Sequence, residues 1–275
     1  MDNKDFAVFI LTHGRPDNIK TLKSLNKSGY TGRIYYIVDN EDKTAEKYKE
    51  NFGEEFVKIF DKKALADQVD EGNNFDERRT ITHARNASFQ IAREIGIKYF
   101  VQLDDDYGSF LYRYERGLTI KSIDRVFDLF IDFYKSTNAK SIAFSQGGDH
   151  IGGFAGTKLK RKCMNSFFCS TDREFQFIGA MNEDVNTYTT LGSRGDLFFT
   201  FTSIQLNQEP TQSQKSGITD MYLRYGTYCK AFTTIMMMPS SVKVSMMNSN
   251  NPRLHHSIKW INTTPMIISE NNKKY

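Results

Sequence analysis

Three consecutive aspartates, Asp104, Asp105 and Asp106, follow the apolar run from Tyr99 to Leu103. Adjacent carboxylates raise each other's pKa unless a cation is present. Their hard oxygens suit Mg²⁺ or Mn²⁺, and an ion held there could clamp a diphosphate and neutralise a departing phosphate. A solvated acidic turn without metal is the alternative, because aspartate is common in turns. The position directly after an apolar run favours the metal site.

Polar residues also follow the first two apolar runs. Thr12 and Arg15 come after the first run, where a guanidinium and backbone donors could meet phosphate. Asp39 ends the second run, where its carboxylate could accept hydrogen bonds from a base or a ribose. The alternative for this segment is a plain turn in which Asp42 caps the next helix, and both interpretations are compatible.

Three further positions could carry chemistry. Arg85 lies on the helical stretch before the aspartates and could meet phosphate or the acidic cluster, although an exposed helix arginine is the alternative. Asp184, next to Glu183, could be a general base, although helix capping is the commoner role. The neighbours His255 and His256 could supply a metal ligand or form a surface pair.

The elements that must position these residues alternate in the first half of the chain. Apolar runs predict buried strands over 6–11, 33–38, 56–60 and 99–103, helical patterns predict helices over 18–27, 44–51 and 81–95, and 67–74 is predicted to be a loop. Gly96 is well placed to end the third helix. This alternation favours an α/β fold with a mostly parallel sheet, in which ligands bind at the carboxyl ends of the strands.

The second half of the chain is less regular. We expect an amphipathic helix over 120–134 capped by Thr119, a helix over 218–232, a polar loop over 205–214, a frayed end from Ser269, and strands over 141–145, 175–177, 197–201 and 242–246. No repeat or linker divides the chain. We therefore predict one domain over residues 1–275.

The composition indicates a globular protein with a large core. The 275 residues include 39% hydrophobic residues, with 22 Phe and 14 Tyr. Three cysteines without metal-type spacing argue against a disulfide framework and a zinc site. The net charge of +4 permits a polyanionic partner without demanding one. The sequence has no signal-peptide pattern and no membrane-length apolar run, so we expect a cytoplasmic protein.

The order of these segments resembles the GT-A glycosyltransferases, most closely the family-two branch that uses nucleotide sugars. The resemblance rests on Thr12 to Pro16 after a strand, Asp39 at a strand end, Ala84 to Asn86 on a helix and Leu103 to Asp106. Within that branch these segments look like the TET-associated glycosyltransferases of phages. The resemblance is clear over residues 6 to 110 and thinner beyond. It implies a GT-A, Rossmann-like sheet flanked by helices, with a nucleotide-sugar half over 1–110 and an irregular acceptor half over 111–268.

The resemblance also implies roles for the donor-side residues, in the binding of a UDP-sugar. Thr12, Arg15 and Asp39 would surround the uracil and ribose, and Arg85 would lie near the base or diphosphate. Asp104 would face the ribose. Asp105 would also belong to the residues that bind the nucleotide sugar, but the resemblance implies no specific contact for it.

The remaining roles concern the metal and the reaction. Asp106 would bind Mn²⁺ or Mg²⁺, and His256, in preference to His255, would complete the metal site. Asp184 would be the general base of an inverting single displacement.

Relatives of this subfamily are linked to sugar addition on hydroxymethylated pyrimidines, so the resemblance implies an acceptor such as 5-hydroxymethylcytosine in phage DNA, reached by base flipping. Basic residues could contact phosphates, or form a solvated patch: Arg78, Arg79, Lys158, Lys160, Arg161 and Lys162. Competing interpretations are a GT-A enzyme acting on a polysaccharide or protein, a nucleotidyltransferase, for which Gly14 to Pro16 is a poor phosphate loop, and a non-catalytic DNA- or sugar-binding module.

Overall fold

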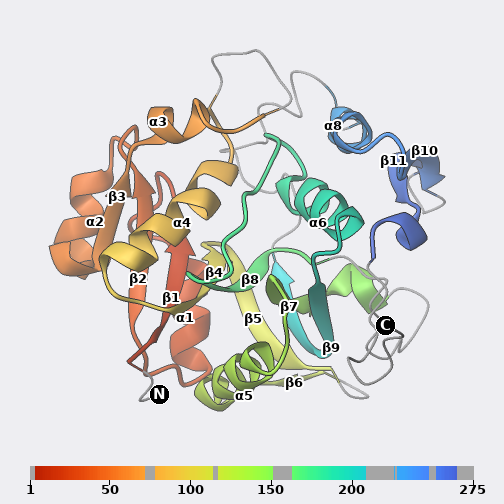
Figure 1. Cartoon of the computed structure of the whole chain (residues 1–275). Coiled ribbons are helices and arrows are strands. Elements are labelled where there is room, and N and C mark those ends of the chain that lie inside the picture. Colours follow the sequence, from red (N-terminus) through yellow and green to blue (C-terminus); the bar gives the residue numbers. More distant parts are fainter. Residues whose placement is uncertain are drawn as a thin grey trace.

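Nine strands form one mixed sheet in this computed structural model, which describes residues 4–71, 78–113, 117–150, 163–208, 226, 228–247 and 252–264. The strand order is β3-β2-β1-β4-β8-β7-β9-β5-β6 (Figure 1). The bounds are β1 Phe6–Leu11, β2 Ile34–Asp39, β3 Val57–Phe60, β4 Tyr99–Asp104, β5 Tyr107–Tyr112, β6 Leu118–Thr119, β7 Ser141–Gln146, β8 Ser166–Ser170 and β9 Phe198–Gln208.

Helices cover both faces of this sheet (Figure 1). Their bounds are α1 Lys20–Lys27, α2 Ala45–Phe52, α3 Lys62–Ala66, α4 Thr82–Glu94, α5 Ile123–Lys135 and α6 Glu183–Ser193, with short 3-10 turns η1 Glu54–Phe56 and η2 Gly147–His150. Alternate residues of a strand point to opposite faces. Accordingly, Phe6, Val8 and Ile10 pack in the core layer with α1 and α5, whereas Phe9 packs in the layer with α4 and α6. The α/β architecture predicted from the sequence is confirmed.

One edge of the sheet gathers the polar ends of the strands. The strands from β3 to β4 are parallel, so their carboxyl ends meet there, and β7 and β9 are parallel to each other. The antiparallel strand β8 begins at the same edge, because Ser166 pairs with Leu103. Only two residues lie between the end of β4 and the start of β5, yet β5 pairs with β9, with Tyr107 opposite Gln208. The last strands of the sheet therefore return to the end of β4.

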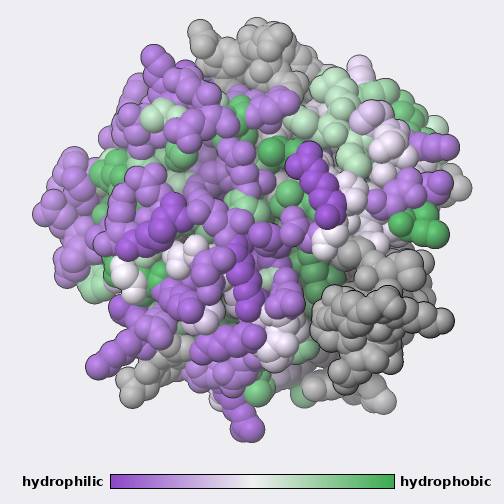
Figure 2. Space-filling view, in the orientation of Figure 1, coloured by the Kyte–Doolittle hydropathy of each residue, from purple (hydrophilic) through white to green (hydrophobic). Residues whose placement is uncertain are grey.

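A small C-terminal unit packs beside α6. It consists of α8 Cys229–Met237, the antiparallel strands β10 Val242–Met247 and β11 Arg253–Ile258, and η3 Trp260–Asn262. The rings of Tyr188 and Trp260 stack at 5.8 Å between centroids, which joins this unit to α6. Its surface carries exposed apolar side chains, whereas the surface over α2 and α4 is hydrophilic (Figure 2). That the whole chain forms one domain stays a prediction.

Several sequence predictions are wrong in detail. Residues 175–177 do not form a strand, because the side chain of Asn86 takes the place of a strand partner: it donates to the Phe177 carbonyl at 3.0 Å and accepts from the Phe177 amide at 2.8 Å. Helix α5 begins after Ser122, so Thr119 does not cap it and lies in β6. Residues 205–208 belong to β9 rather than to a loop.

Other elements were shifted or not predicted. Helix α8 ends five residues beyond the predicted helix, whose positions 218–225 lie outside the described residues, as do 72–77, 209–214 and the end from Ser269. Gly96 follows α4 with φ +70°, as expected for a helix-ending glycine. Cys163 and Cys169 are buried free thiols. Within the described part of the chain, no helix has the length and apolar character needed to span a membrane.

Candidate active site at the carboxyl edge of the sheet

The three aspartates form the turn between β4 and β5, and their carboxylates point to three different partners. Asp104 Oδ1 accepts from Arg85 Nη2 at 3.0 Å. Asp105 Oδ1 accepts from Arg15 Nη1 at 2.8 Å, and Asp105 Oδ2 accepts from the Thr12 hydroxyl at 2.8 Å. Asp106 lies 3.4 Å from the Gln208 side-chain amide. Each aspartate therefore has a separate structural setting.

Burial dominates the electrostatics of this acidic turn. It raises the pKa of Asp104 to about 7 against the opposing charge of Arg85, and Asp106 adds to the rise. Burial also raises the pKa of Asp105, against Arg15, and of Asp106, where repulsion from Asp105 contributes. Carboxylates held together in this way are stabilised in their charged form by a bound cation. The donor set thus fits a divalent ion.

The turn after β1 is built around Asp105 and Tyr48. The Tyr48 hydroxyl lies 2.8 Å from the Thr12 hydroxyl and accepts from the Arg15 backbone amide at 2.8 Å. Gly14 has φ +69°, a conformation that favours glycine, and its amide donates to Asp42 at 2.7 Å. Thr12 and Arg15 are thus fixed at the same edge as the aspartates.

Asp39 is buried at the end of β2 and already has two basic partners. Its Oδ2 lies 2.6 Å from His13 Nδ1, and its Oδ1 lies 3.3 Å from Lys62 Nζ. Burial alone would raise the pKa of Asp39, but the His13 hydrogen bond and the Lys62 charge outweigh it and lower that pKa. Asp42 also accepts from the Thr44 amide at 2.8 Å and so orders the turn before α2. The N-cap of α2 is Thr44, without a side-chain cap, so the predicted cap at Asp42 is wrong.

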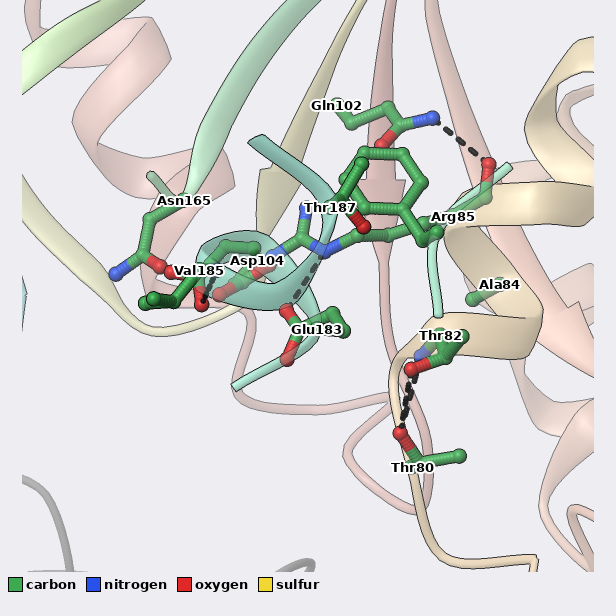
Figure 3. A network of polar contacts seen from close by, with 12 residues as sticks. Thr80, Thr82, Ala84, Arg85, Gln102, Asp104, Asn165, Glu183, Val185 and Thr187 are labelled. Carbon is green, nitrogen blue, oxygen red and sulfur yellow. Dashed lines mark hydrogen bonds and ion pairs between the residues drawn. The ribbon is translucent and has the colours of Figure 1, made fainter. Parts of the chain in front are cut away.

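Arg85 is buried between the acidic turn and α6 (Figure 3). Its Nη2 donates to Asp104, and its Nε donates to Glu183 Oε1 at 3.1 Å. The guanidinium lies over the rings of Phe167 and Phe177, at 5.0 and 5.7 Å from their centroids. Arg85 therefore connects β4 with the start of α6.

Asp184 lies in the first turn of α6, directly after Glu183. It is 5% exposed, and one carboxylate oxygen accepts from the Val185 amide at 2.7 Å. Burial, followed by repulsion from Glu183, raises the pKa of Asp184 to about 6. A carboxylate with such a pKa is suited to accept a proton near neutral pH. Asn182, at φ +55°, binds this turn to α8 through hydrogen bonds to the Lys230 carbonyl and the Thr234 hydroxyl.

A carboxamide cluster, consisting of Gln146, Asn165 and Gln208, adjoins Asp106. Gln208 Oε1 accepts from Asn165 Nδ2 at 2.6 Å and from Gln146 Nε2 at 3.2 Å, while its Nε2 faces Asp106. The three amides come from the ends of β7 and β9 and from the residue before β8. This cluster extends the polar edge toward the second half of the chain.

Comparison with known proteins identifies the family. The family model described as TET-Associated Glycosyltransferase matches residues 6–217. The chain belongs to this family. It is therefore a glycosyltransferase, and the resemblance noted in the sequence is confirmed. No curated protein matches the chain.

Solved structures show distant likenesses to this TET-associated glycosyltransferase. Glucosyl-3-phosphoglycerate synthase from Mycobacterium tuberculosis, in complex with Mn²⁺ and UDP-glucose, is 10% identical, with a TM-score of 0.48 and coverage of 92% of this chain and 86% of that one. TarS from S. aureus is 13% identical, with a TM-score of 0.42 and coverage of 84% and 65%.

The other predicted site residues of this TET-associated glycosyltransferase lie in segments other than the acidic turn, or outside the described residues. His256 lies on β11 opposite Val244, with its ring 4.2 Å from that of His255. Arg78 binds Glu41 at 2.7 Å, and Arg79 is exposed. Lys158, Lys160, Arg161 and Lys162 lie outside the described residues.

Sequence analysis did not single out several residues that shape this TET-associated glycosyltransferase site. Tyr48 and Lys62 sit in short helices whose patterns give no sign of a site, and Gln208 falls where a loop was expected. Glu183 was visible as the neighbour of Asp184, but its ion pair with Arg85 joins positions 98 residues apart. Only the folded chain reveals such partners.

Proposed function

We propose that this glycosyltransferase moves a sugar from a UDP-sugar to the hydroxymethyl group of 5-hydroxymethylcytosine in phage DNA, with a divalent metal and with inversion. The observation that carries the proposal is the single polar edge on which Asp104, Asp105 and Asp106 meet the Arg85-linked pair Glu183 and Asp184. The membership of the TET-associated family supports the DNA acceptor.

The donor side would bind the nucleotide through residues of the first four strands. Thr12, Arg15 and Asp39 would lie around the uracil and ribose, and Asp104 would face the ribose. Asp105 would keep Thr12 and Arg15 in place through the hydrogen bonds described above. The distant relative from Mycobacterium tuberculosis has been crystallised with Mn²⁺ and UDP-glucose, a donor of the proposed class.

Asp106 and His256 would hold Mn²⁺ or Mg²⁺. When bound, such an ion neutralises charge on a departing diphosphate. Among the residues described in the structure, no three His, Cys, Asp or Glu side chains gather as a complete metal site. Diphosphate oxygens of the donor would complete the coordination, which makes metal and donor binding interdependent.

Asp184 would act as the general base. It takes the proton from the acceptor hydroxyl while the acceptor oxygen forms a bond to the anomeric carbon. The bond from that carbon to the diphosphate oxygen breaks in the same step, and its electron pair leaves with UDP. Attack opposite the leaving group inverts the anomeric configuration. The raised pKa of Asp184, about 6, keeps it basic enough for this task near neutral pH.

The acceptor side would consist of the second half of the chain together with Arg78 and Arg79 from the first. A hydroxymethyl group in a duplex is reached by flipping the base, and basic side chains would bind the phosphates. We assign this role to Arg78, Arg79 and the run from Lys158 to Lys162. An acceptor in phage DNA would place the reaction in the cytoplasm of the infected host.

Incubation of the protein with hydroxymethylated DNA, Mn²⁺ and a panel of nucleotide sugars tests the proposal. Mass spectrometry of the digested nucleosides should show a hexose or pentose mass added to 5-hydroxymethylcytosine with one UDP-sugar. Unmodified DNA and Asp184→Asn are the controls. Hydrolysis of a UDP-sugar without any DNA product would refute the DNA acceptor and point to a polysaccharide or protein. Absence of both UDP binding and transfer would refute the donor assignment.

A further inference from the structure

We infer that Arg85 is a positioning residue that couples donor binding to the catalytic base, and that it does not contact the diphosphate itself. This inference rests on the proposed function and changes the role expected for Arg85. The buried guanidinium of Arg85 binds Asp104, on the proposed donor side, and Glu183, beside the proposed base. Both sides of the proposed site are therefore positioned by the same side chain.

The burial of Arg85 argues against direct phosphate contact. Its side chain is 1% exposed, whereas those of its partners Asp104 and Glu183 are 16% and 12% exposed. The parts of this triad that face solvent are therefore carboxylates. A diphosphate would have to replace one of them, and its negative charge would then lie beside the other.

The surroundings of the guanidinium are built to hold it in place. The rings of Phe167 and Phe177 lie against it, and the Asn86 side chain binds both backbone groups of Phe177. The Gln102 side chain donates to the Arg85 carbonyl at 2.9 Å. Neighbours on α4 and β4 thus fix the backbone of Arg85 and one of the rings beside its side chain.

The geometry requires arginine. A planar guanidinium can donate to two carboxylates in two directions and still stack on rings, whereas an ammonium is a point charge on a flexible stem. Among the described residues Nη1 has no hydrogen-bond partner, and it is buried. Nη1 is therefore the atom through which a direct phosphate contact would have to occur, and the experiment below distinguishes that contact from positioning.

The coupling follows from the order of residues on α6. Glu183 and Asp184 are consecutive in its first turn, so a shift of Glu183 moves the proposed base. The same guanidinium fixes Asp104, which would face the ribose. Removing the Glu183 charge should therefore disturb nucleotide binding, although Glu183 lies on the acceptor side.

The experiment compares UDP and uridine, which lacks phosphates, as calorimetric ligands of the full-length chain with Mn²⁺. In Glu183→Gln both ligands should bind three- to tenfold more weakly, and in Arg85→Lys both should weaken by one common factor. Asp184→Asn, the neighbouring change, should leave both affinities unchanged, as should Arg93→Lys on the outer face of α4. Weakened UDP binding with unchanged uridine binding in Arg85→Lys would show a direct phosphate contact and overturn the inference.

A second measurement is independent of the donor assignment. The melting temperatures of Asp104→Asn, Glu183→Gln and the double variant form a cycle, and the loss in the double variant should be smaller than the sum of the single losses, since both pairs share Arg85. Additive losses in melting temperature would show that Arg85 does not couple Asp104 to Glu183. If the wild-type protein binds no UDP but the cycle shows this coupling, the proposed donor is refuted. The coupling of Asp104 to Glu183 through Arg85 would still stand.

Discussion

Arg15 Nη1 donates to Asp105 Oδ1 across 2.8 Å, although the two residues are 90 positions apart in the chain. The middle aspartate of the acidic turn is thus engaged inside the protein, where it also accepts from Thr12. Asp104 is engaged with Arg85, and Asp106 has only a distant amide contact in the described structure. Of the three, Asp106 is the one best placed to bind an ion.

Asp105→Asn should loosen the turn after β1. The amide group has an NH₂ in place of one carboxylate oxygen, so it cannot accept from Thr12 and Arg15 on both sides. The free energy of unfolding should fall by about 1–3 kcal/mol, and UDP should bind roughly tenfold more weakly because Thr12 and Arg15 are displaced. Thermal melting and calorimetry measure the two effects. Asp172→Asn, which changes a surface aspartate paired with Lys98, is the control. Full UDP affinity in Asp105→Asn would exclude the anchoring role.

Asp106→Ala should abolish metal-dependent binding of the UDP-sugar with little loss of stability. The pKa of Asp106 is raised by burial and by Asp105, so its charge does not stabilise the fold without a cation. Calorimetry with and without Mn²⁺ should show a metal effect in the wild type and none in the variant. A preserved metal effect would remove Asp106 from the metal site.

Asp184→Asn should abolish transfer and leave nucleotide binding largely intact. Loss of a general base reduces a rate by about 10²–10⁴-fold. The melting temperature should stay equal or rise, because burial disfavours the charged form of this carboxylate. Rates from nucleoside mass spectrometry and affinities from calorimetry provide the comparison. An active variant would mean that another group takes the proton.

The rate of transfer should rise with pH through about 6 and then level off. Asp184 acts in its deprotonated form, and burial with repulsion from Glu183 raises its pKa from the usual 3.8 to about 6, so protonation inactivates the base below that value. Measurement of kcat/KM from about pH 5 to about pH 8 would reveal this limb. In Glu183→Gln the midpoint should move to lower pH. A flat profile across the acid range would contradict the assignment of Asp184.

Binding to DNA should weaken steeply with salt if DNA is the acceptor. Each phosphate contact that is lost reduces the slope of log K against log salt by about 0.9. Replacing Lys158, Lys160, Arg161 and Lys162 with alanine should remove up to about four phosphate contacts and reduce that slope accordingly. The matched control replaces Lys27, Lys49, Lys58 and Lys135, which lie on α1, α2, β3 and α5. Equal slopes in both variants would mean that the run from Lys158 to Lys162 does not bind DNA.

Local sequence patterns predicted the parallel strands from β3 to β4 because these elements are locally determined. Strand β1 is a continuous apolar run whose residues are all buried, and its bounds match the prediction. Helix α4, Thr82–Glu94, lies within the predicted helix, and Gly96 follows its C-cap residue Ile95. Thr12, Asp39 and Asp104 therefore lie at the carboxyl ends of these strands, and their binding roles stay predictions.

The structure of the second half of the chain depends on long-range contacts that a local sequence pattern does not reveal. Strand β8, Ser166–Ser170, was not predicted, and it is buried only because β4 and β7 flank it. The segment 175–177 has the composition of a strand, yet a single side chain, Asn86, satisfies the backbone of Phe177. Arg85 has the sequence context of an exposed helix residue and becomes buried through Phe167 and Glu183.

The acidic turn also connects two strands that are not neighbours in the sheet. Only Asp105 and Asp106 separate β4 from β5, and β5 pairs with β9, the strand that ends in Gln208. A ligand that binds these carboxylates therefore stabilises the arrangement of β4 relative to β5 and β9. Its binding free energy adds to the free energy of unfolding. In the absence of a donor and its cation, repulsion among the carboxylates destabilises the turn between β4 and β5. Substrate supply would then set the rigidity of the second half of the chain as well as the rate of reaction.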